Sequence, residues 1–333
     1  MEKRFAFAFL LGKSGNKMKR IRKITILGAG NVGATVAYTL ATDGMCSEIV
    51  LVDINKDKAE GEVMDISQGL AFSPAVKLTA GDYSDAAGSD IVIVTIGAAR
   101  KAGQSRIDLA QGNVNLIKNV MPQVVEYSPN AIYVVVSNPV DIITYAILKY
   151  TSLSPNQVIG TGTLLDASRL RTILASRLAF APSNVHAYVF GEHGDSSVVP
   201  WSLITVSSVP ISSYCEKIGD KNFCSTENLE AIEDEVRKSG GVVIQKKQAT
   251  YYAIAMSVRH LCECLLRNAS SILTVSSLLT GQYGISDVCM SLPFVVNSNG
   301  VGESIEPPLL ESELMALHHS AEVLKNTLNS IEI

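Results

Sequence analysis

Short runs of aliphatic, mostly β-branched residues recur along the first half of the chain, separated by longer stretches with a helical pattern. The clearest apolar runs occupy residues 24–27, 49–52, 91–95 and 132–136, and a helical pattern covers residues 34–42. Near-continuous apolar strands of this kind are typical of a parallel sheet that helices cover on both faces. The alternation therefore predicts a doubly wound α/β fold over about the first 150 residues.

The second half of the chain has a more mixed pattern. Residues 185–190 and 201–206 resemble strands, and a long, mainly helical pattern covers residues 229–279. We expect three parts, which are an N-terminal extension at 1–19, a doubly wound parallel-sheet domain at 20–160 and a mixed α+β domain at 161–333.

The first residues contain the one candidate targeting segment. Lys3 and Arg4 precede an apolar run at residues 5–11, but the residues after that run lack an A-x-A-like cleavage site. We therefore interpret residues 1–17 as an extension, a tag remnant or an arm that embraces another subunit. The expected location is cytoplasmic, and secretion is the minor alternative.

The composition excludes several classes of protein. Among 333 residues, 47% are hydrophobic and 18% are charged, which supports a large buried core and excludes wholesale disorder. The net charge is −4, and the basic tract from Lys19 to Lys23 is short, so nothing indicates a nucleic-acid partner. No apolar run reaches the roughly 18 residues that a membrane-spanning helix needs.

Six cysteines are too few for a disulfide framework in a chain of this length. Cys262 and Cys264 form a C-x-C pair, but in a helical pattern residues i and i+2 do not face each other. No second pair of ligands stands at zinc spacing. The expectation is buried, reduced thiols and no metal site.

A glycine motif directly follows the first predicted strand. Gly28, Gly30 and Gly33 form G-x-G-x-x-G between a strand and a helix, where glycines allow a tight turn and close approach of a pyrophosphate. Asp53 ends the next strand 20 residues beyond Gly33, at the place where an acid accepts hydrogen bonds from ribose hydroxyls. Its charge would repel a 2′-phosphate. The sequence therefore predicts a Rossmann domain that binds NAD.

Four further segments carry polar residues suited to chemistry. His193 stands in the turn motif G-E-H-G-D after an apolar strand, and Asp166 and Arg169 share one helical face at i and i+3. Asn138 follows a buried strand, where open α/β sheets bind their ligands. Arg106 ends a cationic loop that leaves another strand.

Together these motifs, in this order, resemble the lactate/malate dehydrogenase family over essentially all of residues 21–333. The resemblance implies that His193 donates a proton to the substrate carbonyl and that Asp166 orients the imidazole and stabilises its charge. Arg106 would swing in with a closing loop and polarise the carbonyl. A carboxylate beside a histidine raises the histidine pKa toward the working pH, which suits this role.

The resemblance also implies how substrate and cofactor are held. Arg169 would bind the substrate carboxylate bidentately, and Asn138 would hydrogen-bond the substrate, with a cis bond to Pro139. Further positions match cofactor contacts of the family, namely Val32, Lys58, Tyr83, Gly97 and Ala98.

The choice between lactate and malate rests on conflicting residues. Arg100 matches the position that reads the substrate side chain, where arginine is the malate pattern because it pairs with a second carboxylate. Glu192, by contrast, resembles the lactate enzymes, as do Thr250 at the substrate pocket and Ile254 against the nicotinamide. The sequence favours pyruvate and lactate, with oxaloacetate and malate or a dual specificity as the alternative.

Two residues point to regulation. Arg171 and His186 match the positions at which allosteric bacterial lactate dehydrogenases bind fructose 1,6-bisphosphate across a subunit interface. The family also implies a homotetramer. An ordinary surface arginine and a strand histidine remain the structural alternative for this pair.

Two activities outside the dehydrogenases remain as alternatives. An NAD-dependent glycosidase would need a metal held by Cys and His, but Cys262 and His260 stand together inside a helical pattern. A catalytically silent NAD-binding protein would not need to retain a full catalytic set, which here comprises His193, Asp166, Arg106 and Arg169.

Overall fold

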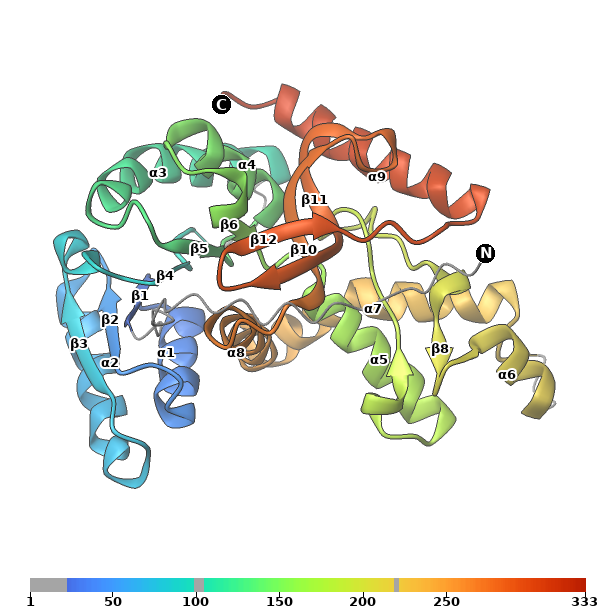
Figure 1. Ribbon diagram of the computed structural model, residues 1–333, viewed down its shortest axis with the longest axis horizontal. Coiled ribbons are helices and arrows are strands. Elements are labelled where there is room, and N and C mark those ends of the chain that lie inside the picture. The colour runs from blue at the N-terminus through green and yellow to red at the C-terminus, as the bar shows by residue number, and fades with distance from the viewer. Residues whose placement is uncertain (1–22, 99–104, 219–221) are drawn as a thin grey trace, which may run out of the picture.

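The computed structural model describes residues 23–98, 105–218 and 222–333. Within these residues a nine-stranded sheet has the order β12-β11-β10-β6-β5-β4-β1-β2-β3 (Figure 1). Its parallel strands are β1 (Lys23–Leu27), β2 (Glu48–Val52), β3 (Lys77–Gly81), β4 (Ile91–Val94), β5 (Ile132–Val135) and β6 (Val158–Gly160). The expected N-terminal extension lies outside the described residues.

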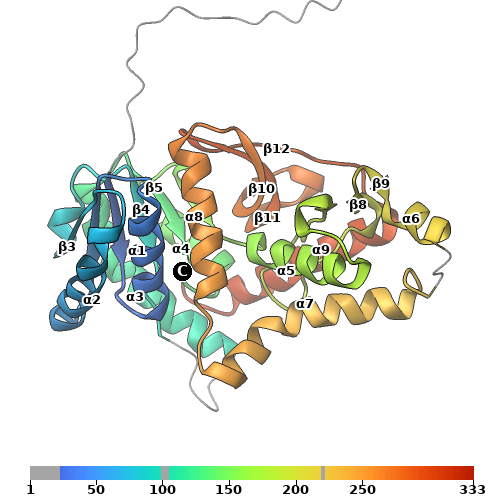
Figure 2. The same cartoon turned by 90° about the horizontal axis from the view of Figure 1, so that it is seen from below.

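The strand order reverses direction between β1 and β4, as the doubly wound prediction requires. A crevice for a ligand forms at such a reversal, beyond the carboxyl ends of the strands. Figure 1 shows α3 and α4 on one face of the parallel strands and α1 on the other, and Figure 2 shows α8 beside α1. These helices and their neighbour α2 are α1 (Asn31–Asp43), α2 (Lys56–Gly69), α3 (Arg106–Tyr127), α4 (Val140–Tyr150) and α8 (Tyr252–Leu266).

The four apolar runs correspond to β1, β2, β4 and β5, whose side chains are almost all buried. Two parallel strands did not show in the apolar pattern. The edge strand β3 is mostly half-exposed, and β6 has only three residues. A strand that is short or lies at an edge needs few apolar residues, which explains why the pattern missed both.

The predicted helical pattern over residues 229–279 is wrong in its last part. α7 (Thr226–Lys247) and α8 are helices, but Ser271–Thr280 form β10, which pairs antiparallel with β11 (Ser286–Asn297). Asn268 and Ser270 have φ of 52° and 47°, so the backbone turns out of the helix before β10. Because β10 is buried on both faces, its apolar residues do not alternate and give no strand period.

The two predicted strands at 185–190 and 201–206 are only partly confirmed. A small sheet joins β7 (Val185–His186), β8 (Thr205–Val206) and β9 (Val209–Pro210). Residues Trp201–Leu203 form a 3₁₀ turn instead of strand. The remaining elements are α5 (Leu164–Leu178), α6 (Ile211–Ile218), α9 (Glu311–Asn329) and β12 (Gly300–Ser304).

Two apolar cores hold these elements together. The larger core runs through the whole nine-stranded sheet and includes Leu261 of α8 and Leu317 of α9. The smaller core joins α5 and α7 through residues such as Leu170 and Val236. The helix that carries Asp166 and Arg169 is therefore supported by both α7 and the central sheet.

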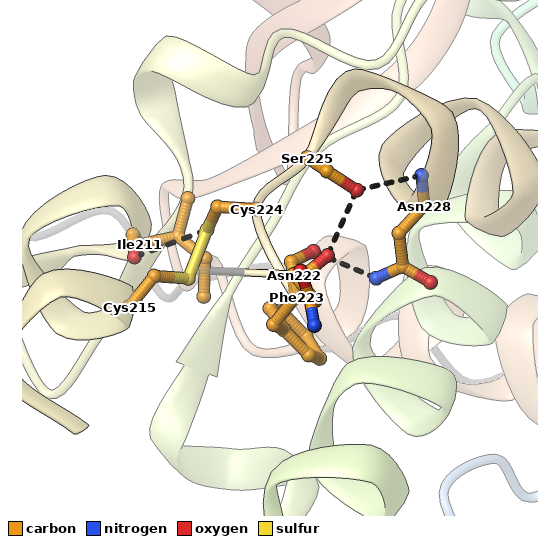
Figure 3. The surroundings of a disulfide bond; sticks show 7 residues. All are labelled: Ile211, Cys215, Asn222, Phe223, Cys224, Ser225 and Asn228. Carbon is orange, nitrogen blue, oxygen red and sulfur yellow. Dashed lines mark hydrogen bonds between the residues drawn. A yellow bond between two sulfur atoms is a disulfide. The ribbon is translucent and has the colours of Figure 1, made fainter. Parts of the chain in front are cut away.

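Cys215 and Cys224 form a disulfide with an S–S distance of 2.03 Å (Figure 3). The expectation of reduced thiols is wrong for this pair. The two residues are nine apart, and the turn before α7 brings their Cα atoms to 6.2 Å, which an overall cysteine count cannot reveal. The other four cysteines are free and buried, namely Cys46, Cys262, Cys264 and Cys289.

Candidate active site

The glycine motif forms a tight turn from β1 into α1. Gly28 has φ of +105°, and a Cβ on Gly33 would lie only 1.8 Å from the Gly28 carbonyl oxygen, so both positions require glycine. A Cβ on Gly30 would meet nothing among the described residues within 4 Å, so this position faces open space. Val32 follows in the first turn of α1, whose N–H groups no described side chain caps. The turn is therefore suited to a phosphate.

Asp53 ties this turn to the end of β2. Its Oδ2 accepts a hydrogen bond from the Ala29 N–H at 2.6 Å, and its Oδ1 accepts one from the Asn55 N–H at 2.9 Å. Asp53 and Tyr83 line a pocket of about 410 Å³, and burial together with Asp53 raises the pKa of Tyr83. Lys58 is exposed on α2 and does not line this pocket.

An asparagine that the sequence analysis missed joins the ends of β4 and β5. Asn113 of α3 accepts a hydrogen bond from the Ala98 N–H at 2.9 Å and donates one to the Asn138 carbonyl at 2.7 Å. It also contacts the position where Gly97 would carry a Cβ. The bond from Asn138 to Pro139 is cis, as predicted. A buried asparagine on the otherwise apolar stripe of α3 was the signal that could have identified it.

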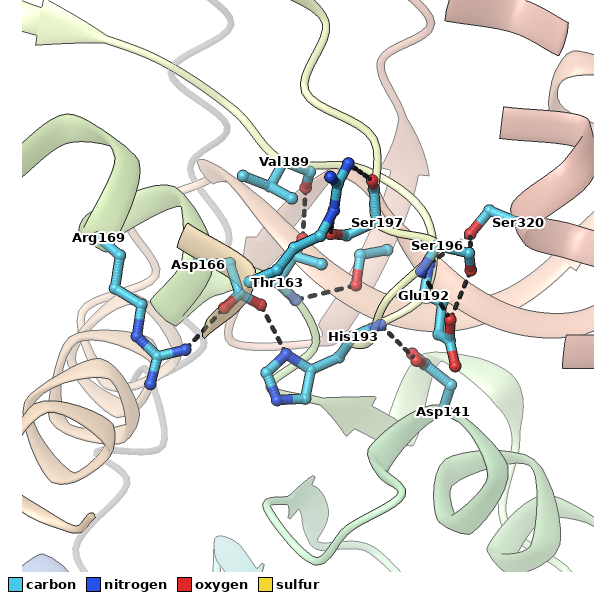
Figure 4. A network of polar contacts seen from close by, with 12 residues as sticks. Asp141, Thr163, Asp166, Arg169, Val189, Glu192, His193, Ser196, Ser197 and Ser320 are labelled. Carbon is cyan, nitrogen blue, oxygen red and sulfur yellow. Dashed lines mark hydrogen bonds and ion pairs between the residues drawn. The ribbon is translucent and has the colours of Figure 1, made fainter. Parts of the chain in front are cut away.

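His193, Asp166 and Arg169 form one connected group (Figure 4). The Asp166 Oδ2 lies 2.6 Å from the His193 Nδ1, and its Oδ1 accepts a hydrogen bond from the Arg169 Nη1 at 2.8 Å. Asp166 is buried, while the other two side chains are partly accessible. Since Nδ1 faces the carboxylate, the opposite ring nitrogen, Nε2, is left for another partner.

The charged side chains of this group shift one another's pKa. Burial alone would lower the pKa of His193, but the neighbouring Asp166 outweighs it and raises the pKa to about 9. Burial alone would raise the pKa of Asp166, but His193 and Arg169 hold it below its ordinary value. At neutral pH the group therefore consists of an imidazolium, a carboxylate and a guanidinium.

Arg106 is the first residue of α3 and lies close to the turn at residues 191–195. Its Nη2 donates to the Asp195 Oδ2 at 2.6 Å, and both side chains are exposed. The structure thus places Arg106 beside the turn that carries His193. The specificity candidate Arg100 lies outside the described residues.

The turn around His193 is fastened to α9 by a network that the sequence analysis did not predict. The Glu192 N–H donates to the Ser320 Oγ at 2.8 Å, and the Ser196 hydroxyl donates to the Glu192 carboxylate (Figure 4). A Cβ on Gly191 would lie 2.6 Å from the Ser320 Oγ, so the glycine allows this contact. The Glu192 side chain therefore forms its hydrogen bond within the turn itself, with Ser196.

The remaining predicted residues lie on other elements of the second half of the chain. Thr250 stands between α7 and α8, and Ile254 of α8 packs partly buried against the large core. Arg171 lines a pocket of about 370 Å³ together with His260, and its Nη2 donates to the Pro182 carbonyl at 3.3 Å. His186 is exposed on β7 and is not part of that pocket lining.

The described residues contain neither a membrane-spanning helix nor a metal-binding cluster. None of their helices is long and apolar enough to cross a membrane. No three His, Cys, Asp or Glu side chains among them converge as ligands for a metal ion.

Comparison with known proteins matches both halves of the chain. The lactate/malate dehydrogenase NAD binding domain matches residues 22–160, and the lactate/malate dehydrogenase alpha/beta C-terminal domain matches residues 163–332. The chain belongs to the lactate/malate dehydrogenase family. The family resemblance predicted from the motifs is therefore confirmed, and so are the Rossmann fold and NAD as the cofactor.

Relatives within the family are similar over nearly the whole chain. The L-lactate dehydrogenase 1 of Clostridium acetobutylicum is 48% identical over 314 residues, which is 94% of this chain and all of the relative. An L-lactate dehydrogenase of Thermoanaerobacter sp. (strain X514) is 46% identical over 313 residues, again 94% of this chain and all of the relative.

Solved structures agree with this placement. The minor L-lactate dehydrogenase of Enterococcus mundtii, in a ligand-bound form, superposes with a TM-score of 0.90 at 37% identity, covering 95% of this chain and all of that one. A lactate dehydrogenase from a Medee basin deep-sea metagenome gives 0.89 at 38% identity, covering 93% of this chain and 99% of that one.

Proposed function

We propose that this protein is an NAD-dependent L-lactate dehydrogenase, which interconverts pyruvate and (S)-lactate. The observation that carries the proposal is the Asp166 carboxylate, which holds His193 and Arg169 on its two oxygens. One carboxylate then holds a proton donor and a carboxylate-binding guanidinium together, which is the pair of groups that the reduction of a 2-keto acid requires. Relatives at 46% and 48% identity bear the name of this activity.

Arg169 binds the substrate carboxylate, because its rigid fork matches the two carboxylate oxygens. Its Nη1 already donates to Asp166, so the guanidinium keeps its orientation before substrate arrives. Asn138 hydrogen-bonds the substrate beside it, and Thr250 bounds the substrate pocket. This grip aligns the carbonyl carbon for hydride transfer.

His193 supplies the proton. Bound NADH supplies the hydride, which leaves negative charge on the carbonyl oxygen. The His193 imidazolium gives its Nε2 proton to that oxygen while Asp166 accepts from Nδ1 and stabilises the charged ring. Arg106 leaves Asp195 and polarises the carbonyl in the closed state. In lactate oxidation the same groups act in reverse.

The cofactor site fits NAD by its shape and charge. The turn of Gly28, Gly30, Val32 and Gly33 offers the pyrophosphate open space at Gly30 and helix N–H groups that no described side chain caps. Asp53 accepts from the ribose hydroxyls and disfavours a 2′-phosphate. The further contacts that we assign to the cofactor are Lys58, Tyr83, Gly97, Ala98 and Ile254.

Arg100 favours the alternative substrate oxaloacetate, since a cation over the pyruvate methyl group would lack a partner. The test is NADH oxidation with pyruvate and with oxaloacetate side by side, each for the wild type and for Arg100→Gln. We expect the wild type to prefer pyruvate and Arg100→Gln to leave that preference intact. A wild-type preference for oxaloacetate that Arg100→Gln reverses would instead identify a malate dehydrogenase.

We extend the proposal to regulation and assembly. Arg171 and His186 form a binding site for fructose 1,6-bisphosphate between subunits of a homotetramer, because an arginine and a histidine with their symmetry mates suit a doubly phosphorylated activator. Residues 20–160 act as the cofactor domain and 161–333 as the substrate domain. The enzyme works in the cytoplasm, where a diffusible nicotinamide cofactor is available.

A further inference from the structure

A second carboxyl group contacts His193 from the side of α4. Asp141 is the second residue of that helix, three residues after the predicted substrate residue Asn138 and two after the cis proline. Only 2% of its surface is exposed. A carboxyl group so deeply buried costs considerable free energy when ionised unless charged or hydrogen-bonding partners compensate.

The contact of Asp141 is with the main chain of His193. The His193 N–H donates to the Asp141 Oδ2 at 2.8 Å (Figure 4). The other carboxylate oxygen, Oδ1, is buried and has no hydrogen-bond partner among the described residues. A neutral asparagine could accept the same N–H at lower cost, so the hydrogen bond alone does not explain why the group is an acid.

The charge of Asp141 acts on the imidazole. Burial raises the pKa of Asp141 to about 6, against the opposing influence of the Ser276 hydroxyl and His193. Above that pH it is a carboxylate, and after Asp166 it is a further group that raises the pKa of His193.

Other charged groups act on the same pair. Arg169 of α5 lowers the pKa of His193, and Glu192, next to His193 in the turn, raises the pKa of Asp141. The Cys289 thiol of β11 is near enough to Asp141 that the carboxylate raises the thiol pKa. The carboxylates Asp141 and Asp166 thus approach His193 from two different helices.

We propose that Asp141 is a second positioning carboxylate of this active site, which anchors the backbone of His193 and adds negative charge beside its imidazolium. The inference rests on the proposed function, in which His193 gives up its proton to substrate. Asp166 aims the ring through Nδ1, whereas Asp141 fixes the chain from which the ring projects. Both favour the protonated state needed for reduction.

The experiment compares Asp141→Asn, which keeps the acceptor without the charge, with Asp141→Ala, which removes both. The first readout is the pKa of His193 itself, measured by an NMR titration of the histidine ring signals. The chain has five histidines, and a spectrum of His193→Asn identifies the signal that belongs to His193. The second readout is the pH profile of pyruvate reduction, with kcat and KM separated. Asp65→Asn, an exposed acid on α2, is the matched control.

We expect Asp141→Asn to lower the pKa of His193 by about one unit and to shift the alkaline limb of reduction equally. KM for pyruvate at neutral pH should stay within about twofold, because Arg169 is untouched. Asp141→Ala should lower kcat by about tenfold or more, and asparagine should restore most of that loss. Asp65→Asn should change neither readout.

Unchanged His193 titration in Asp141→Asn, measured by NMR in the protein without substrate, would overturn the proposal. If Asp141→Ala does not fold, Asp141→Asn still decides. Because the titration does not depend on turnover, it separates this inference from the proposed function: a wild type inactive with pyruvate would refute only the latter.

Discussion

Asp166 shows how much a single residue determines in this protein. One carboxylate accepts hydrogen bonds from a histidine and an arginine that stand on different elements. The i, i+3 spacing of Asp166 and Arg169 predicted that both lie on one face of a helix, and the ion pair between them shows that they do. The contact with His193 spans 27 residues and could be expected only from the family resemblance.

The raised pKa of His193 predicts the pH dependence of catalysis. Reduction of pyruvate needs the protonated ring, so kcat/KM should be flat below about pH 9 and fall tenfold per pH unit above it. Lactate oxidation needs the neutral ring and should rise up to the same pH. Initial rates with NADH and pyruvate, and with NAD and lactate, measure both limbs.

The control for this profile is His193→Asn. It should still bind NADH, measured by fluorescence, but lose about 10²- to 10⁴-fold in turnover. If the wild-type rate of pyruvate reduction instead falls with a midpoint near pH 6.5, the ordinary pKa of histidine, then Asp166 does not set the protonation of the ring.

At the scale of elements, α7 carries two adjacent glycines in the middle of a 22-residue helix. Gly240 follows the buried Ile232 and Val236 at intervals of four, so it lies on the face that packs against α5. A Cβ on Gly240 would stand 3.2 Å from the Arg169 Nη2, whereas a Cβ on Gly241 would meet nothing within 4 Å among the described residues. Gly240 therefore leaves room for the Arg169 guanidinium, to which we assign substrate binding.

This difference gives a matched pair of variants. Gly240→Ala should displace Arg169 and raise KM for pyruvate by about tenfold with a smaller change in kcat. Gly241→Ala should leave KM unchanged and stabilise the helix by up to about 1 kcal/mol. Steady-state kinetics and thermal unfolding of both variants test the prediction, and equal effects on KM would contradict it.

The disulfide belongs to the same scale, because it joins α6 to the turn before α7. Ser225 and Asn228 fix that turn, with the Ser225 Oγ accepting the Asn228 N–H at 3.3 Å (Figure 3). Because the disulfide restricts the unfolded chain, closing so short a loop raises the free energy of unfolding by about 3 kcal/mol at most.

Reduction with dithiothreitol should therefore lower the Tm of the wild type. The double variant Cys215→Ser, Cys224→Ser should have that lower Tm with or without reductant, which controls for effects of dithiothreitol elsewhere. A wild-type Tm that does not respond to reductant would show that the bond does not stabilise the fold.

At the scale of the whole molecule, the surface around Arg171 combines an unpaired polar atom with exposed apolar side chains among the described residues. Its Nε is buried without a hydrogen-bond partner among the described residues, and its pocket is lined by the exposed apolar side chains of Met256 and Ile272. Such a surface fits the proposed contact between subunits.

We expect light scattering to give about four times the chain mass of 35.6 kDa. Fructose 1,6-bisphosphate should lower KM for pyruvate in the wild type and not in Arg171→Gln. Arg177→Gln, six residues later on α5, should respond like the wild type, since Arg177 pairs with Glu235 instead. Activation that survives in Arg171→Gln would move the effector site elsewhere.

The sequence by itself determined what depends on near neighbours. The glycine turn, its Asp53 and the four buried strands follow from local pattern, because residues a few positions apart decide turns, caps and strand burial. The motifs were also sufficient to identify the family.

Only the tertiary structure decided contacts between distant segments. Asp141 meets His193 across 52 residues, and Ser320 meets Glu192 across 128. β10 is a strand because β11 and β6 lie beside it, although its own pattern looked helical. A buried polar or apolar residue shows in the sequence only that it needs a partner, whereas packing of the whole chain decides which partner it meets.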